Sequence, residues 1–161
     1  MDDLVQWLEQ QLDEDERIAH AAGGRSEQEW KADLSGKDPG GMSSWPVAVR
    51  YTTDGRLRGA VANLPVTNER SEDRMVHIAA HDPARVLREI DAKRQLLADL
   101  LAEPHVEVDD PFYSCAVVAR ADVKRYGGPC DCGRDDRQLR RLHILLLPYA
   151  DRPGYREEWR P

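Results

Sequence analysis

The sequence predicts an α+β fold in a single domain, residues 1–161, with a small helical core and one antiparallel β-hairpin. Three observations predict this class. Three segments, 1–20, 83–103 and 135–147, carry apolar residues at helical spacing, and two β-rich runs flank an Asp-Gly pair. The chain is also the size of one ordinary domain, large enough to bury a core without disulfides or other staples.

The helix over 83–103 has the clearest start signal. Asp82 is suited to the N-cap, and Pro83 fits the first helical position, where a missing amide hydrogen costs no hydrogen bond. The apolar residues that follow recur at steps of three and four: Val86, Leu87, Ile90, Leu97, Leu100 and Leu101. This stripe predicts a core helix, which a short helix over 71–80 precedes.

The junction before this helix contains two histidines and an acid. His77 and His81 lie four residues apart, on one helical face, and Asp82 adds a carboxylate beside them. Such a group can serve in metal binding or acid–base chemistry, but the sequence lacks the His-Glu-x-x-His pattern. We therefore favour a structural role, in which His81 caps the junction and fixes the angle between the two helices.

The segment between the first helix and this junction predicts the hairpin. Runs 45–51 and 56–64 flank the tetrapeptide 52–55, which ends in Asp54-Gly55, a hairpin turn signal. Residues 25–44 are poor in apolar side chains and predict a loop, with Trp30 as its anchor. A hairpin is marginal alone, so it must lie on helices or gain a third strand.

Residues 104–134 predict an extended, cysteine-bearing connection in which 113–119 form a short buried strand. After the last helix, Tyr149, Tyr155 and Trp159 lie close to the C-terminus, and we expect them to pack back on the body of the protein. Composition fits this fold, because 40% of the residues are hydrophobic and 33% are charged, which predicts a modest core.

Composition also excludes several classes of function. The sequence has no apolar run that could span a bilayer and no signal peptide, so we expect a cytoplasmic protein without a membrane partner. The three cysteines, an odd number, argue against a disulfide framework. The net charge of −7 disfavours nucleic acid, and seven acids lie within residues 1–20, where they form a solvated helix face or dock to a basic partner.

The cysteines are the best candidates for chemistry. Cys130 and Cys132 lie in the glycine-rich loop 127–133, and Cys115 lies fifteen residues before Cys130. Three thiolates and one histidine suit a structural zinc site, although the spacing differs from the common Cys-x-x-Cys pair. His105 is the most accessible fourth ligand, and His77, His81 and His143 are alternatives. The other interpretations are a buried Cys115 with a reduced, exposed pair, or a redox role for that pair.

Catalytic and nucleotide-binding motifs are missing from the sequence. It has no Gly-x-Ser-x-Gly, no dinucleotide-binding glycine pattern and no phosphate loop. Four arginines gather around the start of the last helix and form a possible nucleic-acid contact: Arg134, Arg137, Arg140 and Arg141. Asp135 and Asp136 beside them offset that charge.

Three blocks of sequence carry a resemblance to a known family: MDDLVQWLEQQLDEDE at the start, HIAAHDPARVLREIDAKR in the middle and LLLPYADRPGYREEWRP at the end. Together they resemble DUF6221, a family of small actinobacterial and actinophage proteins, and the middle block is more loosely similar to Ea22-like accessory proteins of temperate phages. The resemblance implies no activity, cofactor or catalytic residue.

These observations predict a non-enzymatic intracellular accessory or regulatory protein that acts by binding another protein. One alternative is a zinc-stabilised regulator that binds nucleic acid. A second is a hydrolase or redox enzyme whose site has no sequence motif. An exposed apolar patch would favour the first, a basic stripe the second, and a deep pocket with convergent His, Asp or Cys the third.

Overall fold

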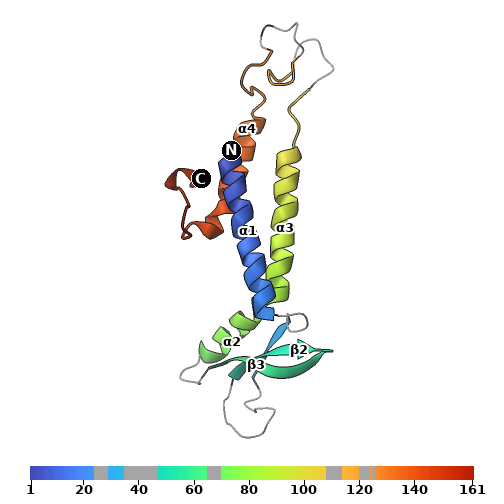
Figure 1. Ribbon diagram of the computed structural model, residues 1–161, viewed down its shortest axis with the longest axis vertical. Coiled ribbons are helices and arrows are strands. Elements are labelled where there is room, and N and C mark those ends of the chain that lie inside the picture. Colours follow the sequence, from blue (N-terminus) through green and yellow to red (C-terminus); the bar gives the residue numbers. More distant parts are fainter. Residues whose placement is uncertain (24–28, 35–46, 65–69, 108–113, 120–123, 125) are drawn as a thin grey trace. The chain divides into compact units, whose positions relative to one another are not determined.

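The computed structural model describes residues 1–23, 29–34, 47–64, 70–107, 114–119, 124 and 126–161 (Figure 1). These residues form four α-helices, two 3₁₀ turns and one three-stranded antiparallel sheet, so the predicted α+β class is confirmed. In chain order the elements are α1 Asp2–Gly23, β1 Trp30–Asp33, β2 Val47–Thr53, β3 Arg56–Leu64, α2 Arg70–Ala80, α3 Pro83–Ala102, α4 Arg134–Leu146, η1 Leu147–Tyr149 and η2 Glu157–Trp159. In the described part of the chain, no helix is both long enough and apolar enough to cross a bilayer.

The chain divides into two compact units. One unit comprises Met1–Gln11 and Ala92–Pro161, and the other comprises Leu12–Asp91. Helices α1 and α3 each contribute residues to both units, so continuous helices join them. A single domain over 1–161 stays a prediction.

The sheet lies in the unit Leu12–Asp91. Its predicted hairpin is confirmed: β2 and β3 pair antiparallel, and the turn residues Asp54 and Gly55 have φ values of 52° and 72°, the left-handed pair that a type I′ turn requires. The predicted loop over 25–44 is wrong at β1, which pairs antiparallel with β2 and places Trp30 opposite Tyr51. The rest of that range, apart from residues 29 and 34, lies outside the described residues, as does the start of the first predicted arm, 45–46.

Helix α2 covers one face of this sheet. Val49 from β2 and Met75 and Ala79 from α2 are buried together. The partly buried side chains that pack against them are Trp30, Ala32, Ala62 and Ile78. Trp30 is therefore the anchor that the sequence predicted. The hairpin gains both a third strand and a helical cover, either of which can stabilise a hairpin.

The junction between α2 and α3 is fixed by hydrogen bonds. The Asp82 carboxylate accepts the Arg85 amide at 2.6 Å, as an N-cap does, and accepts the Trp30 amide at 3.2 Å through its other oxygen. The His81 ring nitrogen Nδ1 lies 2.8 Å from the His77 carbonyl oxygen. Helix α3 begins at Pro83, as predicted, and Asp82 ties that start to strand β1.

In the other unit, the C-terminal tail packs on the first half of α1. The Trp7 ring lies 5.9 Å from that of Tyr155 and 5.3 Å from that of Trp159, measured between ring centroids, and Trp159 is buried. Gly154 has a φ of 86°, and a Cβ atom there would lie 2.9 Å from Trp7 Nε1. Only glycine fits this position without strain. The predicted packing of the aromatic tail is confirmed.

Candidate metal centre

Four side chains of the types that bind metal ions converge in the connection between α3 and α4. His105 lies three residues after the end of α3, and Cys130 and Cys132 lie just before the start of α4. Cys115 is buried at the start of a turn, which the Val118 amide closes on the Cys115 carbonyl at 3.0 Å. The strand predicted over 113–119 is therefore wrong in residues 114–119, where only Ser114 makes an isolated bridge, to Glu107.

Four of the six distances between the ligand atoms are close to those of a tetrahedral zinc site. His105 Nδ1 lies 3.5 Å from Cys115 Sγ and 3.7 Å from Cys132 Sγ. Cys130 Sγ lies 3.6 Å from Cys132 Sγ and 3.9 Å from Cys115 Sγ. Zinc–sulfur bonds of about 2.3 Å and zinc–nitrogen bonds of about 2.0–2.1 Å place two sulfurs about 3.8 Å apart and a sulfur and a nitrogen about 3.5 Å apart. All four ligand atoms lie within 4.8 Å of one another, so one ion can reach every ligand.

Backbone hydrogen bonds hold the turn that bears Cys115. The Cys115 amide donates to the Val106 carbonyl at 2.8 Å, next to His105. The Ala116 amide donates to the Asp131 carboxylate at 2.9 Å, and Asp131 lies between the other two cysteines. These hydrogen bonds hold the turn to the segment that bears His105 and to the loop that bears Cys130 and Cys132.

Polar groups around the ligands favour metal binding. The pKa of Cys130 is held below its usual range, first by a hydrogen bond from the Asp135 amide and also by one from the Cys132 amide, while burial opposes this shift. His105 Nδ1 faces the sulfurs, and its Nε2 lies 3.8 Å from an Asp135 carboxylate oxygen. Histidine ligands of zinc commonly direct their second ring nitrogen to such a carboxylate.

One comparison with known proteins identifies the family. The sequence model of one family of unknown function matches residues 1–161, the whole chain. The chain belongs to the DUF6221 family. This is a family of unknown function, and the resemblance of the three sequence blocks to it is confirmed. No curated protein and no solved structure matches the chain.

In this DUF6221 chain, three of the four arginines that are predicted to contact nucleic acid bind the end of α3 and hold α4 against it. Arg134 donates to the carbonyls of Glu103 and Leu101 at 2.7 and 3.1 Å. The Glu103 carboxylate accepts from Arg137 at 2.9 Å and from Arg141 at 2.8 Å. The hydrogen bond from Arg137 is the main reason that the pKa of Glu103 lies below its usual range.

The predicted nucleic-acid contact of this arginine group stays a prediction, since the Arg137 and Arg141 side chains are 42% and 53% exposed. Arg137 also donates to the Cys132 carbonyl at 3.0 Å, so it joins α4 directly to the metal centre. Arg140, the fourth member of the group, is exposed. Arginine in this DUF6221 chain thus contacts the loop of the candidate ligands and satisfies carbonyls that the end of a helix leaves without intrahelical partners.

Of the four histidines that the sequence offers as the fourth metal ligand, the cluster contains His105. Among the described residues, the group that can hold a metal includes His105 and no other histidine. His143 lies on α4, partly buried, and His77 and His81 belong to the unit Leu12–Asp91. Sequence reasoning missed three acids that support the site: Glu103, Asp131 and Asp135. The sequence indicated these three acids only through their positions, beside a candidate ligand or at the end of a helix.

Proposed function

We propose that His105, Cys115, Cys130 and Cys132 bind one structural zinc ion, and that the chain is a zinc-stabilised binding protein without catalytic activity. The observation that carries this proposal is the convergence of one imidazole and three sulfurs, whose ligand atoms lie within 4.8 Å of one another. A site with four protein ligands leaves no position for water or substrate, which distinguishes structural from catalytic zinc.

The donor set supports zinc over other metals. Three thiolates and an imidazole are soft or borderline ligands, which exclude magnesium and calcium, and iron–sulfur clusters commonly use four cysteines. The cysteines are free thiols, and three of them cannot all pair within one chain. Zinc also stabilises three thiolates that would otherwise repel one another.

The metal would hold together three segments of the connection. His105 follows α3, Cys115 lies on a turn, and the remaining ligands precede α4. Zinc contributes roughly 10–16 kcal/mol of apparent binding free energy in small zinc domains, far more than single hydrogen bonds do. Bound zinc would therefore fix how α3 and α4 meet, and the exposed surface of those helices would serve as a binding face for another protein chain.

The test is the metal content of the protein after purification without added zinc. We expect about one equivalent of zinc per chain, as four-ligand structural sites bind. Cys115→Ser and His105→Gln should abolish it, and the matched control His143→Gln should retain it. Absence of stoichiometric metal, with all three thiols titrating freely in the folded protein, would overturn the proposal.

A further inference from the structure

Two of the three cysteines at the candidate metal centre are accessible to solvent. Cys130 and Cys132 are half-buried, and the residues on either side of Cys130, Pro129 and Asp131, are exposed. Cys115 is buried, with 0% of its surface exposed. Oxidation of cysteine follows the exposure of its sulfur. A small polar oxidant therefore reaches Cys130 and Cys132 before it reaches Cys115.

The sulfurs of these two accessible cysteines are close enough to join. Cys130 Sγ lies 3.6 Å from Cys132 Sγ and 3.9 Å from Cys115 Sγ. A disulfide needs about 2.05 Å between its sulfurs and no more than about 7 Å between its Cα atoms. Residues two apart in a chain lie at most about 7 Å apart at Cα. Cys130 and Cys132 can therefore form a bond through movement within one loop.

The other possible partner, Cys115, is held on its own turn. The Cys115 amide donates to the Val106 carbonyl at 2.8 Å, and the Ala116 amide donates to the Asp131 carboxylate at 2.9 Å. A bond from Cys130 to Cys115 would have to draw this buried turn toward the loop. Closure of the loop onto Cys132 leaves the turn in place.

We infer that the candidate metal centre is also a redox switch, in which hydrogen peroxide joins Cys130 and Cys132 in a disulfide and zinc leaves. Cys115 stays a thiol. This switch rests on the proposed function, because it adds regulation to that same zinc site.

The oxidation proceeds in two steps. The Cys130 thiolate attacks one oxygen of the peroxide, so that an S–O bond forms, the O–O bond breaks and hydroxide leaves. The Cys132 thiolate then attacks the Cys130 sulfur, so that the S–S bond forms, the S–O bond breaks and a second hydroxide leaves. Each hydroxide takes a proton from solvent. The two thiolates thus lose two electrons, and the peroxide is reduced to two waters.

Loss of zinc follows from the number of ligands that remain. The thiolate is the form of cysteine that binds a metal, so the disulfide leaves His105 and Cys115 as the only two of the four ligands. Without the ion, the end of α3 and the start of α4 lose the link that we propose for them. A thiol reductant and zinc together would restore it.

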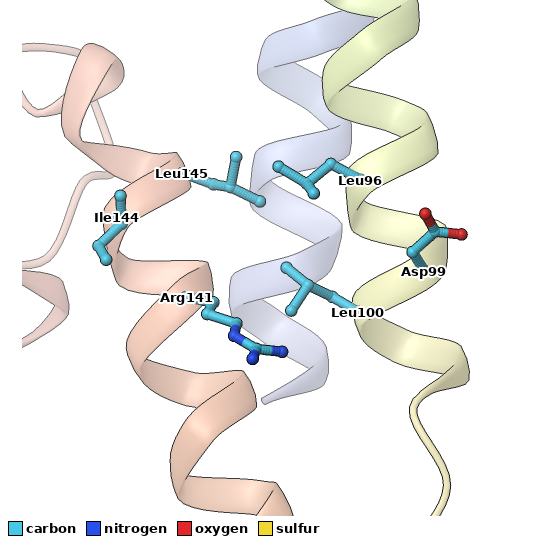
Figure 2. Close-up of a pocket in the computed structure, with 6 residues that line it drawn as sticks. All are labelled: Leu96, Asp99, Leu100, Arg141, Ile144 and Leu145. Atoms are coloured by element: carbon cyan, nitrogen blue, oxygen red, sulfur yellow. The ribbon is translucent and has the colours of Figure 1, made fainter.

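The helices that this link joins have an apolar surface between them. Leu96 and Leu100 of α3 and Leu145 of α4 are directed into a hollow of about 300 Å³ between the two helices (Figure 2). Oxidation at the metal centre would therefore act on the proposed binding face through the ends of α3 and α4.

The test adds a few equivalents of hydrogen peroxide to the zinc-containing full-length protein. Residues 126–134 form one tryptic peptide that holds both Cys130 and Cys132. We expect this peptide to lose the mass of two hydrogens, and Cys115 to remain open to alkylation after denaturation. A chelating dye should detect release of about one equivalent of zinc, and dithiothreitol with added zinc should reverse both changes.

Two controls separate the oxidation from the loss of metal. Protein stripped of zinc by a chelator, without peroxide, should keep all three thiols. Cys115→Ser retains the accessible pair and should still form the disulfide within peptide 126–134, whereas Cys132→Ser should form no link within that peptide.

The zinc content before peroxide is added tests the proposed function separately. Protein that starts without zinc would overturn the zinc site and the switch with it. Protein that starts with zinc would overturn the switch alone if peroxide left the zinc bound. It would do the same if peroxide linked peptide 126–134 of the wild type to the peptide that holds Cys115.

Discussion

The sheet and the candidate metal centre are held together by different interactions. The sheet is built from backbone ladders and a buried cluster of Val49, Met75 and Ala79, so its stability comes from regular pairing and apolar burial. The described part of the connection between α3 and α4 has an isolated bridge, turns and a few buried residues, among them the candidate ligand Cys115. The order of this connection depends instead on the convergence of one histidine nitrogen and three cysteine sulfurs.

This difference predicts different responses to the same treatments. Removing zinc should loosen the connection and leave the sheet intact, whereas a cavity under the sheet should leave the zinc bound. A protein whose two regions melted together under both treatments would break the comparison.

Loss of a buried ligand should have the largest effect. Cys115→Ser removes one thiolate, so the remaining ligands no longer close the site, and we expect the free energy of unfolding to fall by more than about 4 kcal/mol in the presence of zinc, the range that loss of a structural metal gives. The measurement is chemical denaturation with and without added zinc. Val117→Ser is the control, because Val117 is exposed on the same turn.

Truncation of the sheet core should come next. Met75→Ala leaves a cavity between α2 and the sheet, and we expect a loss of roughly 2–5 kcal/mol, the usual cost of emptying a buried site. The zinc content should stay at the wild-type value. Val76→Ala, an exposed neighbour, should change the free energy of unfolding little. Loss of zinc in the Met75 variant would show that the two regions are not independent.

Removal of the Asp131 side chain, which supports the candidate ligands, should have a moderate effect on zinc affinity. Asp131→Ala removes the acceptor of the Ala116 amide, which holds the Cys115 turn against the other two cysteines. We expect zinc affinity, measured by competition with a chelating dye, to fall roughly 10–100-fold, as for other outer-shell partners of metal ligands. Asp136→Ala, an exposed acid of α4, is the matched control. Unchanged affinity would mean that the turn needs no such support.

The ion pairs of Glu103 should have the smallest effect. Their side chains are partly exposed, by 23% for Glu103 and 42% for Arg137, and ion pairs in contact with solvent contribute little to stability. Glu103→Gln should lower the thermal midpoint slightly and leave zinc binding intact, with Glu107→Gln as the control. A loss of zinc in Glu103→Gln would show that these pairs position the ligands.

Local patterns were enough to predict much of the fold. The Asp54-Gly55 turn and the Asp82-Pro83 helix start depend on the conformational preferences of the residues themselves, so both were found from sequence. Strand β1 was not, because its four residues lack turn signals and its conformation is set by pairing with β2. The strand predicted around Cys115 failed for the related reason that a run of apolar residues fits a buried turn equally well.

The ligand types were predictable and the supporting residues were not. Three cysteines near one loop histidine satisfy the known preference of zinc, and this led to His105. The roles of Asp131 and Glu103 depend on distances between segments far apart in sequence. The contacts of Arg134 and Arg141 with the end of α3 could not be predicted from sequence, because the carbonyls and the carboxylate that bind them belong to another helix.

X-ray absorption at the zinc edge, on protein purified without added metal, tests the central claim most directly. The account predicts about three sulfurs at 2.3 Å and one nitrogen near 2.0–2.1 Å, with the sulfur count lowered by one in Cys130→Ser if that variant retains metal. A spectrum of oxygen and nitrogen ligands alone, or protein without zinc, would contradict it.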